Sequence, residues 1–176
     1  IYLESKERNA SLDDASLNEI AHNVANGTIR YELIKPDLDK IITFDINTSL
    51  KLEGDTCSYI QYSCVRAARI LEKSDKKPDF NTSFDQLNTE HDLNLIKQIG
   101  MFEIFVNDAA KNYSPKVIAK YCYGLAVTFS SFYEHVKVLK AETPELVNAR
   151  LCLVLSFGLT LEKALDLLGI TVPQRM

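Results

Sequence analysis

Residues 55–73 read Asp-Thr-Cys-Ser-Tyr-Ile-Gln-Tyr-Ser-Cys-Val-Arg-Ala-Ala-Arg-Ile-Leu-Glu-Lys, and this segment is the most informative part of the chain. Asp55 or Thr56 can cap a helix that begins just after Gly54, and no Gly or Pro follows before Pro78. We therefore predict a helix here. At about 100° per residue, five polar or aromatic side chains share one arc: Tyr59, Tyr62, Arg66, Arg69 and Lys73. Small apolar side chains form a packing face on the other side: Ile60, Cys64, Ala67, Ala68 and Leu71.

The polar arc, which we name the Tyr/Arg stripe, places two aromatic rings ahead of three cations. Aromatic rings stack on unpaired bases and cations hold the neighbouring phosphates, so the pattern suits single-stranded nucleic acid. Two other interpretations stay open from spacing alone, because tyrosines often border a core and basic stripes are often only solvated. The formal net charge is −4, so any RNA binding must rest on this local patch and weaken as salt rises.

Composition describes an ordinary folded protein. The chain has 176 residues, of which 46% are hydrophobic and 25% charged, which excludes a disordered chain. The four cysteines form no Cys-x-x-Cys pair, so we expect buried free thiols and a cytoplasmic protein. No signal peptide and no apolar run of about 18 residues are visible, so we expect no membrane span. Because the sequence starts at Ile1 without a methionine, we expect a fragment of a longer protein.

The part of the chain before the stripe predicts a mostly helical connector. A helix should open at residues 11–14, be interrupted at Gly27 and end at Pro36. Residues 41–44 are rich in β-branched side chains and predict an isolated strand or an extended crossing segment. Residues 47–52 predict one short helical turn.

The part after the stripe predicts only helices, following a polar loop at residues 74–88. Helices are expected over residues 91–99 and 101–111, with Gly100 either between them or inside one long kinked helix. A third should begin with Ser114 as its cap and Pro115 at its first position.

The last helix should follow a connection at residues 135–143, starting at Pro144 and ending at Gly169. The predicted fold is therefore all-α. It consists of a bundle of about five main helices over residues 55–176, preceded by a connector over residues 1–54.

Signs of catalysis are few. His22, His91 and His135 are scattered without Cys or carboxylate partners at ligand spacing, and no phosphate-cradling glycine loop occurs. We expect no catalytic residue, metal or cofactor in this chain. Two further features leave a nucleic-acid contact open beside a packing or solvated role: Tyr133, at the end of Phe129-Ser-Ser-Phe-Tyr, and Lys116 with Lys120 one turn apart.

Several motifs together resemble arginyl-tRNA synthetases. Leu52-Glu-Gly-Asp-Thr-Cys-Ser-Tyr-Ile-Gln-Tyr-Ser-Cys-Val-Arg66 is similar to the family motif F-E-G-N-T-x-P-Y-L-Q-Y-A-H-A-R. Further similar segments follow the family's order: Gly27-Thr-Ile-Arg-Tyr31, Phe44-Asp, Ser114-Pro-Lys-Val-Ile-Ala-Lys-Tyr-Cys-Tyr-Gly-Leu-Ala, Phe129-Ser-Ser-Phe-Tyr and Leu165-Asp-Leu-Leu-Gly-Ile-Thr-Val-Pro-Gln-Arg-Met. The resemblance covers nearly the whole chain from about residue 12. The sequence departs from the family pattern at four positions: Asp55, Ser58, Cys64 and Ser130.

The resemblance implies the C-terminal anticodon-binding domain, of the DALR type, of a class I synthetase that joins arginine to its tRNA using ATP and Mg. The H-x-G-H and K-M-S-K-S signatures are absent, so this portion alone should be inactive and hold no cofactor. The implied partners are the anticodon stem-loop of an arginine tRNA and the enzyme's own catalytic domain, in a monomer.

The resemblance also implies the contacts. Tyr59, Tyr62 and Arg66 should contact the anticodon loop, joined by Tyr133 and Met176. The helical spacing, and not the resemblance, adds Arg69 to these contacts and Lys73, Lys116 and Lys120 as phosphate contacts. The alternatives are a helical protein-interaction module or the related domain of another synthetase, such as a cysteinyl or glycyl enzyme.

Overall fold

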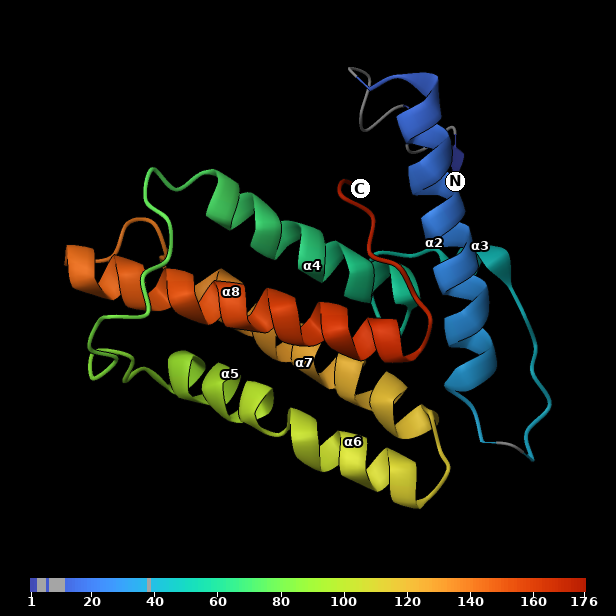
Figure 1. Ribbon diagram of the computed structural model, residues 1–176. Coiled ribbons are helices and arrows are strands. Elements are labelled where there is room, and N and C mark those ends of the chain that lie inside the picture. Colours follow the sequence, from blue (N-terminus) through green and yellow to red (C-terminus); the bar gives the residue numbers. More distant parts are fainter. Residues whose placement is uncertain (3–5, 7–11, 38) are drawn as a thin grey trace.

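The structure is a computed structural model that describes residues 1–2, 6, 12–37 and 39–176. Its helices cross or run along one another in a single assembly (Figure 1). Their bounds are α2 (Asp14–Ile34), α3 (Ile46–Ser49), α4 (Cys57–Glu72), α5 (Glu90–Gly100), α6 (Phe102–Lys111), α7 (Lys116–His135) and α8 (Pro144–Leu167). No strand occurs among the described residues. The all-α prediction, with five main helices after residue 55 and a mostly helical connector before them, is confirmed.

Helices α7 and α8 form the centre of the bundle. Helix α7 packs against α4, α5, α6 and α8, and α8 also packs against α4 and α5. The rings of Phe129 and Phe157 join the two central helices, stacked 3.8 Å apart and both fully buried. Helix α8 has the length and apolar composition of a membrane-crossing helix, but here those apolar side chains supply the core of the bundle.

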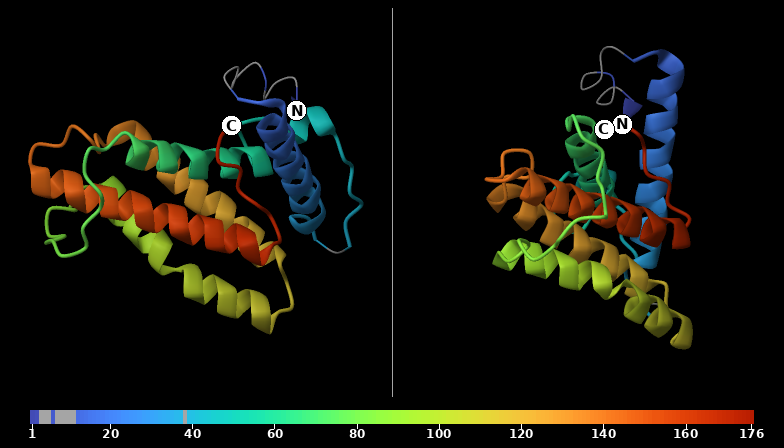
Figure 2. Two further views of the ribbon diagram at one scale, coloured as in Figure 1. Left: turned by 45° about the horizontal axis from the view of Figure 1, so that its top comes forward. Right: turned by 60° about the vertical axis from the view of Figure 1, so that its left-hand side comes forward.

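Helix α2 lies across one end of the bundle, as two further views confirm (Figures 1 and 2). It is continuous through Gly27, so the predicted interruption is wrong. A Cβ on Gly27 would lie 2.8 Å from Gln61 Nε2 and 3.0 Å from Cys57 Sγ. The lack of a side chain at Gly27 therefore allows α2 and α4 to approach closely. At this crossing, Gln61 donates hydrogen bonds to the carbonyls of Asn23 (3.3 Å) and Thr171 (2.8 Å).

Helix α4 begins as predicted, with Thr56 as its cap. The Thr56 hydroxyl accepts a hydrogen bond from the Tyr59 amide at 3.2 Å and donates one to the Lys51 carbonyl at 2.6 Å. The predicted packing face is only partly right, because Ala68 is exposed. More of the helix is buried than one face, since α2, α7 and α8 all pack against it. Ser58, Gln61, Ser63 and Val65 are therefore also buried.

Three other local predictions are settled. Gly100 ends α5 and α6 begins at Phe102, so two separate helices form. Ser114 makes no side-chain cap; α7 begins at Lys116, and the Ser114 carbonyl accepts the Val117 amide at 3.1 Å. The connection after α7 starts later than predicted, because His135 still belongs to that helix.

The connector between α2 and α4 is extended and open. Residues 41–44 form no strand and are exposed to solvent, so the extended segment is the correct alternative. The short helical turn lies at Ile46–Ser49, slightly earlier than predicted. The chain end leaves α8 through Gly169, whose φ of +67° favours glycine.

Candidate nucleic-acid interface

The Tyr/Arg stripe of α4 lies beside α7, and two aromatic contacts join these helices. The Tyr59 ring meets the edge of the Tyr123 ring, with centroids 6.1 Å apart at an interplanar angle of 61°. Further along, the Arg66 guanidinium lies 3.8 Å from the centroid of the Tyr133 ring and 5.6 Å from that of Tyr62. The fold therefore brings Tyr62, Arg66 and Tyr133 together, and we name these three residues the Tyr/Arg cluster.

The Tyr/Arg cluster is held in place yet reachable from solvent. Tyr62 and Arg66 are half-buried, and 42% of Tyr133 is exposed. A guanidinium on a tyrosine face gains about 0.5–1 kcal/mol at an exposed site, which favours the stacked arrangement. Arg66 makes no hydrogen bond or ion pair within the described part of the chain. Its N–H edge is thus available to a phosphate or a base, while the neighbouring rings offer stacking surface.

The remaining predicted residues lie around this cluster in different ways. Arg69 and Lys73 are exposed toward the C-terminal end of α4, and Lys120 is exposed on α7. Lys116 instead forms an ion pair with Asp37 of the connector. Met176 is half-buried at the end of the tail. The preceding tail residues Pro173 and Gln174 share a hollow with five α4 residues: Cys64, Val65, Ala67, Ala68 and Leu71.

That hollow lies on another side of α4 from the cluster. Ala68 follows Arg66 by two residues, which turns it about 160° around the helix axis. The structure thus groups Tyr62, Arg66 and Tyr133 directly, while the role of Met176 stays a prediction.

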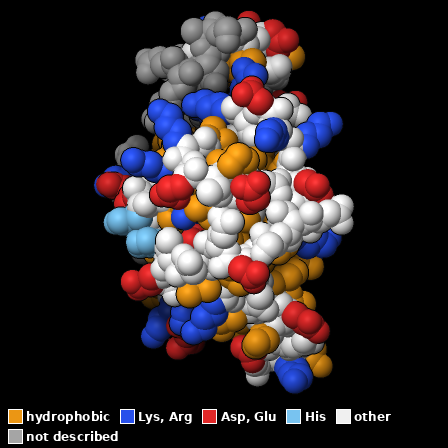
Figure 3. Space-filling view, turned by 90° about the vertical axis from the view of Figure 1, so that its left-hand side faces the viewer, with side chains coloured by type: hydrophobic (Ala, Val, Ile, Leu, Met, Phe, Trp, Pro, Cys, Tyr) orange, Lys and Arg blue, Asp and Glu red, His pale blue; other side chains and the backbone are white. Residues whose placement is uncertain are grey.

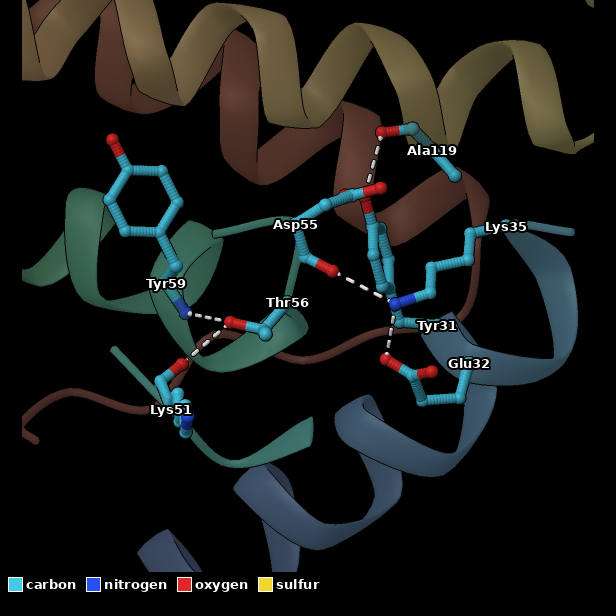
Figure 4. Close-up of polar contacts among 8 residues, drawn as sticks. All are labelled: Tyr31, Glu32, Lys35, Lys51, Asp55, Thr56, Tyr59 and Ala119. Carbon is cyan, nitrogen blue, oxygen red and sulfur yellow. Dashed lines mark hydrogen bonds and ion pairs between the residues drawn. The ribbon is translucent and has the colours of Figure 1, made fainter. Parts of the chain in front are cut away.

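The first turn of α4 is anchored to its neighbours beneath the stripe (Figure 4). The buried Tyr31 hydroxyl of α2 donates to Asp55 at 2.6 Å, and it also lies 3.3 Å from the Ala119 carbonyl of α7. Burial and the nearby Asp55 carboxylate raise the pKa of Tyr31 above its ordinary value, so the hydroxyl remains a donor. Lys35 adds a bond to the Asp55 carbonyl at 2.9 Å. These contacts fix where the stripe begins.

Tyr123 is the residue that sequence reasoning missed at this surface. The helical spacing did not single it out, but its half-buried ring packs against Tyr59. A signal was present, since Tyr123 stands ten residues before Tyr133 on one helix, about 80° away around its axis. The ring contact between Tyr123 of α7 and Tyr59 of α4 is a tertiary contact, so the position of Tyr123 on its own helix does not predict it.

The cysteines take no part in this surface. All four are free and buried, as predicted. Burial raises the pKa of Cys122 to about 12 and also raises the pKa of Cys57 and Cys64, so these thiols stay protonated near neutral pH. Within the described ranges, no group of three or more His, Cys, Asp or Glu side chains could hold a metal ion.

Comparison with known families decides the affiliation of this fold. Residues 60–176 match the DALR anticodon binding domain. The chain belongs to the DALR anticodon-binding family. It is 36% identical to an arginine–tRNA ligase of Methanothrix thermoacetophila, covering 99% of this chain and 31% of the relative. It is 38% identical to one of Borrelia hermsii, covering 100% and 30%.

A solved structure agrees with this affiliation. The fold is similar to Thermus thermophilus arginyl-tRNA synthetase, with a TM-score of 0.87 and 34% identity over 99% of this chain and 30% of that one. The chain thus spans about a third of the length of the relatives it matches. The boundary between a connector (1–54) and a domain (55–176) stays a prediction.

Proposed function

We propose that this chain is the tRNA anticodon-binding portion of an arginine–tRNA ligase. The full-length enzyme would join arginine to its tRNA using ATP and Mg, and this portion would hold the anticodon loop. The family match and the similarity to arginine–tRNA ligases along nearly the whole chain support the proposal.

The observation that carries the proposal is the Tyr/Arg cluster. Unpaired anticodon bases can stack on Tyr59, Tyr62 and Tyr133, and each stacked base contributes about 1–3 kcal/mol. Arg66 supplies a charge at the same place, with its guanidinium 3.8 Å from the Tyr133 ring centroid. Arg69, Lys73 and Lys120 are exposed nearby for phosphates. Lys116 would have to leave Asp37 to do the same.

The proposal is tested by titrating this chain with an arginine-tRNA transcript and with one whose central anticodon base is changed, at several salt concentrations. We expect tighter binding to the unchanged transcript. Tyr62→Ala should weaken that binding about 5- to 150-fold, the equivalent of one lost base stack. Tyr113→Ala is the matched control, because that ring is 91% exposed in the turn before α7 and should matter little.

Each other outcome has a definite meaning. Equal weak binding to both transcripts would place base discrimination outside this chain. No binding at low salt would reject the proposal and favour the protein-interaction module, in which the same tyrosines and arginine would contact a protein.

A further inference from the structure

A basic hollow lies at the end of the bundle where α4 finishes and α8 begins. Its volume is about 550 Å³, and its walls come from residues 73–76 after α4 and from the loop that leads into α8. Lys73, Lys76 and Lys140 all line it, and we name it the lysine hollow. Figure 3 views the molecule from this end and shows Lys and Arg side chains interspersed with Asp and Glu side chains.

The charges of the lysine hollow are not neutralised by pairing. All three lysines are exposed, and none has a carboxylate within 4.0 Å among the described residues. Asp75 and Glu142 also line the hollow, so its formal charge is only one unit positive. The basic character is nevertheless local, in a chain whose net charge is −4.

The hollow continues the Tyr/Arg stripe. Lys73 is both the last residue of the stripe and part of the wall of the hollow. It follows Arg66 by seven residues, or about 10 Å along the helix axis. Arg69 lies between them and is exposed. Exposed cations thus extend along α4 from the Tyr/Arg cluster to the lysine hollow.

We propose that the lysine hollow binds backbone phosphates of the RNA strand that leaves the Tyr/Arg cluster. This inference rests on the proposed function, and adds to it a second contact region that reads no bases. Lysine ammonium groups act as point charges on phosphates, so the contribution is independent of sequence and sensitive to salt. The Tyr/Arg cluster would give specificity for the anticodon loop, and the lysine hollow would add affinity for the neighbouring strand.

The test is a double variant, Lys76→Ala with Lys140→Ala, measured against the arginine-tRNA transcript and the transcript with the changed anticodon base. The matched control is Lys97→Ala with Lys111→Ala, which removes the same charge from exposed positions on α5 and α6. We expect the hollow variant to bind both RNAs more weakly. The slope of log K against log salt should become shallower by about 0.7 for each lost phosphate contact. The ratio of the two affinities should not change.

Three results would overturn the inference. The first is a salt slope in the hollow variant equal to that of the control variant, while Tyr62→Ala still weakens binding; that result leaves the proposed function standing. The second is a changed ratio of affinities for the two transcripts, since phosphate contacts carry no base preference. The third is absence of RNA binding by the unchanged chain, which removes the proposed function together with this inference.

Discussion

Two arginines of the same bundle, Arg150 and Arg66, have opposite surroundings. Arg150 on α8 is buried, and its guanidinium donates to both carboxylate oxygens of Asp92 at 3.4 Å and to the Lys137 carbonyl at 3.3 Å. Asp92 is fully buried and also takes part in the capping box of α5 with Thr89, so both charged groups are bonded to neighbours inside the fold. Arg66 on α4 is half-buried against aromatic rings.

These surroundings indicate which of the two arginines is free to contact a partner. The Arg150 guanidinium is committed to neighbours within the fold, so its contribution is to stability. Arg66 is positioned by the face of Tyr133, and ring contacts leave the N–H edge of a guanidinium open. Burial and the type of neighbour thus separate an arginine whose guanidinium is bonded within the fold from one whose N–H edge is open to a partner. The following predictions test that separation.

The largest effect is expected for Arg150→Ala. It would leave the Asp92 carboxylate buried without its cation, and breaking a buried pair in this way costs about 3–5 kcal/mol of unfolding free energy. Urea unfolding followed by circular dichroism measures the loss. Lys163→Ala, which removes an exposed pair with Asp166, is the control and should stay near wild type. A loss below about 1 kcal/mol would show that the pair is solvated.

A smaller loss is expected for Gly27→Ala, which tests the interior contacts at the α2–α4 crossing. The new methyl group would meet Gln61 Nε2 and Cys57 Sγ inside contact distance, and such overpacking costs about 1–3 kcal/mol. Gly100→Ala is the matched control, because a Cβ there has no atom within 4 Å. If both variants have equal unfolding midpoints in urea, the close approach of the two helices is not tight.

The smallest change in stability is expected for Arg66→Ala. Loss of a cation–π contact at a partly exposed site costs about 0.5–1 kcal/mol, so the unfolding midpoint should move little. RNA binding should weaken and its salt dependence should become shallower, because a charge facing the RNA is lost. Arg66→Lys keeps the charge but loses the planar stack, so its affinity for RNA should lie between those of the unchanged chain and Arg66→Ala. A stability loss as large as that of Arg150→Ala would remove the distinction between the arginines.

Much of the fold could be predicted because helix starts and stops are local. The Thr56 cap, the Pro144 start and the Gly169 end each depend on residues within one turn, and all three occur where expected. The prediction of a break at Gly27 is wrong because it also used local information alone. The low helix propensity of glycine predicts a break, whereas the actual role of Gly27 depends on Gln61 and Cys57, which are distant in sequence.

At the candidate site, helical periodicity alone puts Tyr59, Tyr62 and Arg66 on one side of α4, so this arrangement could be predicted from the sequence. The sequence could not determine which other helix faces them. Only the tertiary structure placed Tyr133 on Arg66 and Tyr123 on Tyr59, committed Lys116 to Asp37, and put the tail on another side of α4. Contacts between helices depend on how whole apolar faces pack, and no local spacing in the sequence encodes that packing.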